Sequence, residues 1–205
     1  MIIRSLELSN YRNYDYLNLE FDPGTNIFHG DNAQGKTNAL EAIYVCATSK
    51  SHRGTKDREM IQFDQEEAHI KMIVEKRDVP YRVDMHLKKG RAKGVAVNGL
   101  PIRKITELFG IINVIFFSPE DLSIIKDSPA ERRRFMDMEL CQLDPIYTFN
   151  LVNYNKVVTQ RNKLLKDLET RPDLADTLPI WDEQMIRYGE NVIARRQAFL
   201  DELND

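Results

Sequence analysis

The residue types and spacing at positions 30–37 are suited to holding a phosphate group. They match the pattern G-x-x-x-x-G-K-[ST] and read Gly30, Asp31, Asn32, Ala33, Gln34, Gly35, Lys36 and Thr37. Glycines let the backbone turn tightly, so that successive N–H groups can converge on an anion at the N-terminus of a helix. The lysine supplies a positive charge to the outer phosphates, and the threonine hydroxyl can bind Mg²⁺. These residues predict a nucleoside triphosphate site with Thr37 as the metal ligand.

The sequence on both sides of this loop predicts the strand–loop–helix unit that the pattern requires. Thr25–His29 is expected to form a short strand after the turn at Asp22–Gly24. Asn38–Val45 is expected to form a helix with one apolar face. A glycine-rich turn that matches by chance is the alternative, but it accounts for neither the lysine and hydroxyl nor the two flanks.

Composition limits the class of protein. The 205 residues are 42% hydrophobic and 30% charged, which suits a globular protein with a core. The net charge of −3 excludes a globally basic nucleic-acid binder, so any DNA contact must come from local patches. Cys46 and Cys141 are expected to be free thiols. The N-terminus has no signal-peptide pattern, and the longest apolar run, Ile111–Phe117, is far shorter than the roughly 20 residues of a membrane span. We expect a cytoplasmic protein without membrane contact.

Alternating strand patterns place the loop within a larger sheet. Ile2–Leu8 and Tyr16–Phe21 predict a hairpin ahead of the strand of the loop, an order typical of ATP-binding-cassette heads and unlike simple nucleotide kinases. After the loop, an antiparallel meander is expected, with the turn signal Asn98-Gly99; its strands are Ala68–Glu75, Tyr81–Leu87 and Gly94–Val97. The fold class predicted is therefore α/β, an ATP-binding-cassette-type head lobe with a mixed sheet and an antiparallel meander, plus a helical second lobe.

Three further elements are predicted within this part of the chain. Glu59–Phe63 is expected to form a short helical turn, Ile102–Phe109 a short amphipathic helix, and Ile111–Phe117 a buried strand. The acids of Ser118–Asp121 are not interpreted as a Walker B motif, because a serine and a proline separate them from the strand end. Pro119 suits the first turn of a helix, where acids act as capping residues.

Basic segments leave two interpretations open. The loop Thr48–Arg58 is either an ordinary solvated connection or a basic loop near phosphates or DNA. The basic tip of the meander either protects a sheet edge or contacts DNA; its residues are Lys88, Lys89, Arg91 and Lys93. Ser128 and Glu131 are expected to cap the start of a helix that carries Arg132–Arg134. Three consecutive arginines span most of the circumference of a helix. They are either part of a solvated surface or a contact to DNA or a nucleotide.

The last part of the chain predicts an antiparallel helical arm, since apolar residues recur at spacings of three and four on both sides of the interruption Glu169–Pro179. The first helix is expected to pack through Tyr147, Leu151, Tyr154, Val158, Leu165 and Leu168, with Arg161 as the one break. The second is expected to pack through Trp181, Met185, Tyr188, Val192 and Phe199. Residues 1–117 are thus expected to form the ATP-binding lobe and residues 118–205 the helical lobe. The last residues are expected to be helical without a stop signal, as if the chain were cut within an element.

Several motifs together resemble the RecF family of bacterial recombination mediators. They run collinearly over nearly the whole chain and comprise Ser5–Tyr14, Gly30–Asn38, Ser51–Arg53 with Asp57–Glu59, Phe117–Leu122 and Ser128–Phe135. The phosphate loop (P-loop) alone would indicate only a large superfamily. The resemblance implies that Gly30–Thr37 and Asn38 form the phosphate and magnesium site. It also implies that Arg12 approaches the nucleotide from the hairpin, that Arg53 is the basic-loop arginine, and that Gln62 and Phe63 lie near the base.

The resemblance further implies a function in DNA gap repair, replication restart and the SOS response. RecF-type proteins bind ATP and DNA junctions, dimerise around ATP, act with RecR and RecO to load recombinase, and hydrolyse ATP weakly when DNA is present. A Walker B acid pair and a signature serine are expected beyond residue 205, so this chain is expected to bind ATP and Mg²⁺ without hydrolysis and as a monomer. A small P-loop nucleotide kinase, with Arg132–Arg134 as a lid, is the alternative; a pure interaction module based on the arm is a third.

Overall fold

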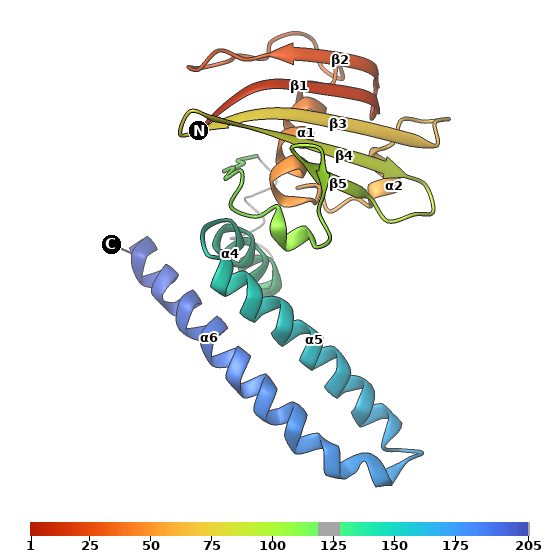
Figure 1. Ribbon diagram of the computed structural model, residues 1–205, viewed down its shortest axis with the longest axis vertical. Helices are drawn as coiled ribbons and strands as arrows, with labels where there is room; N and C mark the ends of the chain where they lie inside the picture. Colours follow the sequence, from red (N-terminus) through yellow and green to blue (C-terminus); the bar gives the residue numbers. More distant parts are fainter. Residues whose placement is uncertain (119–127, 205) are drawn as a thin grey trace. The chain divides into compact units, whose positions relative to one another are not determined.

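The computed structural model describes residues 1–118 and 128–204. The described chain groups into two compact units, Met1–Phe117 and Ser118–Asp205. The first is a sheet with helices on one side, and the second is a set of helices (Figure 1). Within the described residues, no helix is long and apolar enough to cross a bilayer.

The first unit is built on an antiparallel sheet of strand order β2-β1-β3-β4-β5-β6. Its strands are β1 (Ile2–Tyr11), β2 (Tyr14–Glu20), β3 (Glu67–Lys76), β4 (Val79–Lys88), β5 (Gly94–Val97) and β6 (Leu100–Pro101). The hairpin and the meander predicted from the alternating patterns are confirmed. The turn predicted at Asn98-Gly99 is also present, with φ of 52° and 81°, and it pairs Val97 with Leu100.

One face of this sheet forms the core, because every second residue of a strand points to the same side. Apolar side chains from that face pack against helix α1 (Lys36–Thr48); those on β3 are Ala68, Ile70, Met72 and Val74. Cys46 of α1 is fully buried there as a free thiol. The other face of β3 carries Glu67, His69, Lys71, Ile73 and Glu75 and is polar apart from Ile73. A one-sided core of this kind explains the alternation in the sequence.

Two predicted strands are not formed, so the sheet of the described residues is antiparallel and not mixed. At Thr25–His29, Ile27 is 81% exposed, and the Asn26 side chain bonds to the backbone of Asp22 (3.0 and 2.9 Å), which competes with strand pairing. At Ile111–Phe117, Ile112 is buried and makes only an isolated bridge to Phe109. A strand needs a hydrogen-bonded neighbour along its length, and neither segment has one within the described residues.

Two predicted helices are shorter or shifted. Ile102–Phe109 contains only the 3-10 turn η1 (Ile105–Glu107), and the turn predicted at Glu59–Phe63 is the helix α2 (Asp57–Met60). The chain after α2 is extended, because Ile61 bridges Tyr11 at the end of β1. The prediction for Pro119–Asp121 lies outside the described residues.

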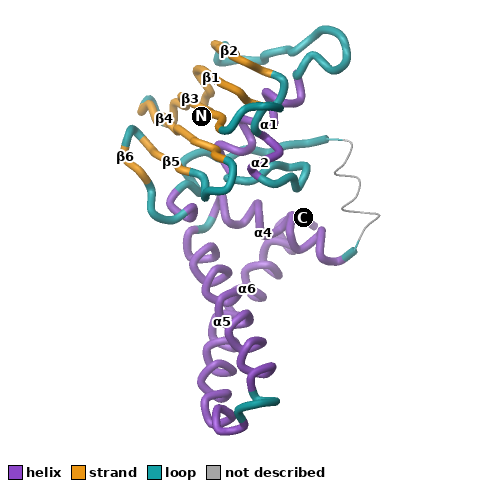
Figure 2. The backbone as a smooth tube through the Cα atoms, turned by 90° about the vertical axis from the view of Figure 1, so that its right-hand side faces the viewer, coloured by secondary structure: helices purple, strands orange, loops and turns teal. Residues whose placement is uncertain are grey.

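The second unit is helical, as predicted (Figure 2). It contains α4 (Pro129–Leu143), α5 (Pro145–Asp167), the 3-10 segment η3 (Pro172–Thr177) and α6 (Leu178–Asn204). Helices α5 and α6 run antiparallel and side by side (Figures 1 and 2). Asp144 caps α5 by accepting bonds from the N–H groups of Ile146 (2.8 Å) and Tyr147 (3.0 Å). Ser128 is the N-cap residue of α4, but its carbonyl and not its hydroxyl accepts from Glu131 N.

Packing of the arm follows the predicted seam in part. Tyr147, Val192 and Phe199 are buried, whereas Leu165 is 39% exposed and does not belong to the core. Val157, which was not predicted, is buried, and the predicted Val158 beside it is only half-buried. Arg161, the predicted break in the seam, forms an ion pair with Asp182 of α6. Arg196 of α6 binds both carboxylate oxygens of Asp137 in α4 (2.7 and 2.9 Å), which ties these two helices together.

Candidate nucleotide-binding site

The P-loop leads directly into α1, because the helix begins at Lys36. Gly30, Ala33 and Gly35 have positive φ angles of 134°, 65° and 95°, which fold the backbone into a tight loop. The N–H groups of Asn38 and Ala39 bond to the carbonyl of Gly35 (2.7 and 3.1 Å) and close the first helical turn. The positive end of the helix dipole therefore lies at this loop.

Lys36 folds back over the loop. Its Nζ donates to the carbonyl of Gly30 (2.8 Å) and to that of Asp31 (2.5 Å). A cavity of about 200 Å³ adjoins the lysine and is lined by Asn32, Ala33, Gln34, Gly35, Lys36, Thr37, Asn38 and Arg53. This lining combines backbone N–H donors with the ammonium of Lys36 and the guanidinium of Arg53, and it contains no carboxylate. Such a surface suits an anion.

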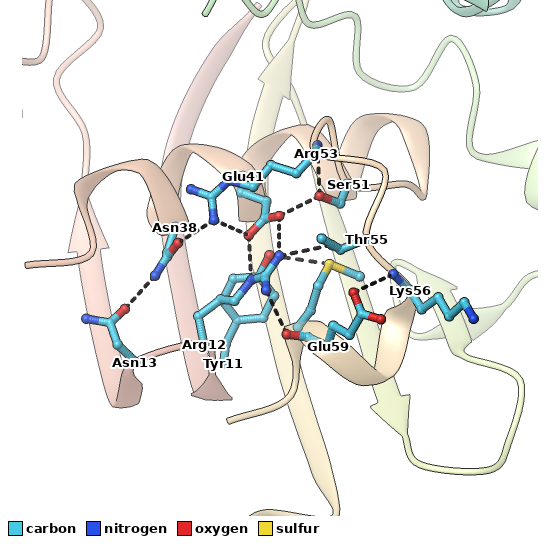
Figure 3. Close-up of polar contacts among 11 residues, drawn as sticks. Tyr11, Arg12, Asn13, Asn38, Glu41, Ser51, Arg53, Thr55, Lys56 and Glu59 are labelled. Atoms are coloured by element: carbon cyan, nitrogen blue, oxygen red, sulfur yellow. Dashed lines mark hydrogen bonds and ion pairs between the residues drawn. The ribbon is translucent and has the colours of Figure 1, made fainter. Parts of the chain in front are cut away.

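Gly35 is held from the other side by the turn between β1 and β2. A Cβ atom at this position would lie 2.5 Å from the Tyr14 hydroxyl and 2.7 Å from the Asn13 amide. Asn13 also accepts a hydrogen bond from the Asn38 amide (2.8 Å), and Arg53 donates to the Asn38 oxygen (3.2 Å). These contacts hold the P-loop on the sheet, and Figure 3 shows the part that runs from Asn13 through Asn38 to Arg53.

A buried carboxylate, Glu41, organises the residues behind the loop (Figure 3). It accepts two bonds from Arg12, Nε to Oε2 at 2.8 Å and Nη2 to Oε1 at 2.6 Å, and one from the Ser51 hydroxyl (2.5 Å). Arg53 adds a longer ion pair at 4.0 Å. Burial by itself raises the pKa of Glu41, but the hydrogen bonds from Arg12 and Ser51 outweigh burial and lower the pKa. Glu41 is therefore ionised at neutral pH.

Arg12 is engaged on every side. Besides Glu41, it donates to the carbonyl of Glu59 (2.7 Å) and to the Thr55 hydroxyl (3.0 Å). Its backbone has a φ of 54°, and its N–H bonds to the carbonyl of Met60. The bond to Glu41 raises the pKa of Arg12, so the guanidinium stays charged. Arg12 thus joins the hairpin to α1, to α2 and to the loop before α2.

A second hollow of about 640 Å³ adjoins the P-loop cavity and shares Asn38 and Arg53 with it. Arg12, Gln62 and Phe63 line it as well. Gln62 donates to Asp15 (2.6 Å), while its own Oε1 is buried without a hydrogen-bond partner. Phe63 is 88% exposed. The residues of the predicted site therefore line two adjoining hollows, except for Gly30 and Asp31, whose carbonyls contact Lys36. The roles of these residues toward a ligand stay predictions.

Four residues of this arrangement were not predicted from the sequence: Asn13, Tyr14, Glu41 and Ser51. A signal was available for Glu41, since it lies among the apolar positions Ala39, Ala42 and Cys46 of the helix. A charged residue on a buried helix face indicates a specific partner. The contacts of Asn13 and Tyr14 depend on tertiary approach and leave no such local pattern.

Several side chains of the basic segments form ion pairs within the described residues. Lys88 binds Glu67 (3.0 Å), Lys89 lies 3.5 Å from Glu66, and Lys93 binds Asp57 (2.9 Å). Arg134 lies 3.5 Å from Glu131 on α4. These ion pairs favour edge protection as the role of the meander tip and a solvated surface as the role of the arginines on α4.

Comparison with known proteins extends these observations. A family profile described as an AAA domain matches residues 5–203. A relative from Agathobacter rectalis, named DNA replication and repair protein RecF, is 62% identical over the whole chain and 57% of its own length. The RecF of Lachnoclostridium phytofermentans is 61% identical with the same coverage. The chain therefore spans little more than half the length of these relatives.

Solved structures show the same relationship. One described as the recombination mediator protein RecF-ATP in the RecFOR pathway superimposes with a TM-score of 0.95 at 35% identity, over 98% of this chain and 54% of that chain. A structure from work on ATP-driven dimerisation of SMC ATPases has a TM-score of 0.55 at 20% identity, over 67% of this chain and 98% of that chain, and it shows a shared fold alone. These matches confirm the predicted head-lobe fold class, while the sheet of the described residues is antiparallel where a mixed one was predicted. The chain belongs to the AAA domain family, and it matches proteins named RecF over its whole length.

Proposed function

We propose that the P-loop of this chain binds the triphosphate of ATP together with Mg²⁺. The observation that carries this proposal is the position of Lys36, whose ammonium lies over a glycine-rich loop at the N-terminus of α1. Phosphate oxygens would replace the carbonyls of Gly30 and Asp31 as its partners. Thr37, exposed in the first helical turn, would bind Mg²⁺ through its hydroxyl.

The other site residues have separate roles in this proposal. Asn38 and Arg53 would contact phosphate oxygens from the wall that the two hollows share. Gln62 and the exposed ring of Phe63 would adjoin the base, since aromatic faces stack on nucleobases. Arg12 would approach the nucleotide from the wall of the larger hollow and keep its hydrogen bond to Glu41.

Substitution of Lys36 tests this proposal. Lys36→Ala is expected to abolish ATP binding in isothermal titration calorimetry with Mg²⁺ present, because it removes the positive charge over the loop. The matched control is Lys71→Ala, since Lys71 lies on the polar face of the sheet and pairs with Glu7. Unchanged affinity in the Lys36 variant would exclude the P-loop as the binding site.

We further propose that the complete protein is a RecF-type mediator of DNA repair and replication restart in the cytoplasm. In this proposal residues 1–117 are the ATP-binding lobe and residues 118–205 the helical lobe. The whole protein would dimerise around ATP, bind DNA junctions, and help RecR- and RecO-type partners to load recombinase. The identity of 62% to a protein named for DNA replication and repair supports this assignment. Failure of the complete protein to bind gapped DNA in the presence of ATP would contradict it.

The alternative of a small P-loop nucleotide kinase is not favoured. The relatives that match over the whole chain carry the RecF name, and the RecF-ATP structure superimposes on nearly all of it. Arg134, part of the lid expected in a kinase, lies beside Glu131 on its own helix.

A further inference from the structure

Two histidines and a glutamate meet on the polar face of the sheet, away from the P-loop. His69 of β3 and His86 of β4 are direct partners in the strand register. Their rings stack with centroids 4.3 Å apart and an interplanar angle of 11°. Glu67 precedes His69 by two residues and therefore shares its face of the sheet. Antiparallel pairing alone brings the three side chains together.

Their ligand atoms converge. Glu67 Oε2 lies 3.1 Å from His86 Nε2, and Glu67 Oε1 lies 3.9 Å from His69 Nε2. One such atom from each residue lies within 4.8 Å of the others. In a tetrahedral zinc site, atoms about 2.0–2.2 Å from the metal are roughly 3.3–3.5 Å apart. All three side chains are partly exposed, so small side-chain rotations can close the difference.

We propose that Glu67, His69 and His86 form a binding site for a divalent transition metal, Zn²⁺ in particular. Two imidazoles and a carboxylate are a ligand set that zinc accepts, with the fourth position left for water. A hollow of about 490 Å³ lined by both histidines gives solvent access to this position. A bound ion would cross-link β3 and β4.

Lys88 is the competitor of the metal. Its Nζ donates to Glu67 Oε2 at 3.0 Å, so a cation at this oxygen must displace the ammonium. Lys88→Met is therefore expected to tighten zinc binding at least threefold. Lys89→Met is the matched control, because Lys89 lies beside Glu66 and not beside the three ligands. A weaker affinity after Lys88→Met would contradict this geometry.

Calorimetric titration of the untagged chain with ZnCl₂ tests the site directly. His69→Gln and His86→Gln are each expected to weaken zinc binding at least tenfold, while His29→Gln, the same change outside the cluster, leaves it unaltered. Excess Mg²⁺ is not expected to compete, because Mg²⁺ prefers oxygen ligands. Equal affinity of the wild type and both cluster variants, or no binding below millimolar zinc, would overturn the proposal.

Thermal unfolding supplies a second measurement that does not depend on nucleotide binding. Zinc is expected to raise the melting temperature of the wild type and of His29→Gln, and this rise is expected to be lost in His86→Gln. The metal-free melting temperatures should agree, since the side chain of His86 is 43% exposed. An equal zinc-dependent rise in all variants would place the ion elsewhere and refute the assignment.

Discussion

Gly35 is the most constrained residue of the P-loop. Gly35→Ala is expected to weaken ATP binding at least tenfold, because a φ of 95° costs an L-residue about 1–2 kcal/mol and the new Cβ would lie 2.5 Å from the Tyr14 hydroxyl. Calorimetry and urea unfolding would measure the two effects. Gly24→Ala is the control, since no heavy atom lies within 4 Å of the Cβ position there. Equal effects of the two substitutions would contradict the proposed close packing.

Glu41 is the residue on which the stability of the site depends. Glu41→Gln is expected to lower the free energy of unfolding by about 3 kcal/mol, because it breaks a buried ion pair. This value is at the low end for such a pair, since the Arg12 side chain is 16% exposed and can reach water. Urea unfolding measures this change. Glu190→Gln, at an exposed position of α6, is the control and is expected to alter stability by less than about 0.5 kcal/mol. A loss no larger than that of the control would show that the pair contributes little.

The same carboxylate predicts a pH dependence. Since folding lowers the pKa of Glu41 below its ordinary value of 4.5, its contribution is fully present above that value. The contribution is lost as the pH falls through the pKa of the folded state. The difference in unfolding free energy between wild type and Glu41→Gln should therefore be constant from pH 7 to about pH 5 and shrink at lower pH. A difference that grows on acidification would show the opposite sign of the shift.

At the scale of elements, the contact between α5 and α6 depends on Gly189. A Cβ at this position would lie 3.2 Å from Cε2 of Tyr154. Gly189→Leu is therefore expected to destabilise the chain by about 1–3 kcal/mol through overpacking, despite the better helix propensity of leucine. Ala194→Leu introduces the same side chain at an exposed position of α6 and is expected to be near neutral.

Tyr154→Ala separates this clash from other effects of Gly189→Leu. In that background the penalty of the leucine should shrink by about 1 kcal/mol or more, because the space of the ring becomes available. Thermal unfolding of the wild type, the two single variants and the double variant measures the coupling between the two positions. Additive effects would mean that the two residues do not limit the approach of the helices.

Periodicity predicted the elements that have a local cause. The strands β1, β3 and β4 alternate because one face of the sheet is buried, and the arm repeats at three and four because its helices pack along one seam. The strand predicted at Ile111–Phe117 is absent, since an apolar run does not reveal whether a pairing neighbour is present. Phe117 is 83% exposed in that segment.

At the scale of the whole molecule, the 205-residue chain is expected to bind ATP without turning it over. No carboxylate lines the P-loop cavity in the part of the chain that the structure describes. Phosphoryl transfer to water requires a residue that orients the attacking water and acids that help to hold the metal. Phosphate release should therefore equal the background with and without DNA. DNA-stimulated turnover that Lys36→Ala abolishes would show that the chain supplies a catalytic acid.

The sequence by itself determined the P-loop, the one-sided sheet and the helical arm. Each depends on residues that lie close together along the chain: Gly30, Gly35, Lys36 and Thr37 for the loop, the alternation of Ala68–Val74 for the sheet, and the spacing of apolar residues for the arm. Patterns of this kind can be detected because local geometry repeats with a fixed period.

Only the tertiary structure decided how the loop is held. Arg12 and Glu41 are separated by 29 residues in sequence, and they form a bidentate pair because the hairpin turn packs beside the buried face of α1. The same approach places Asn13 and Tyr14 against Gly35, so that a side chain there would have to displace them. Contacts between distant segments follow from how the sheet and the helix pack, and no periodicity in the sequence encodes that packing.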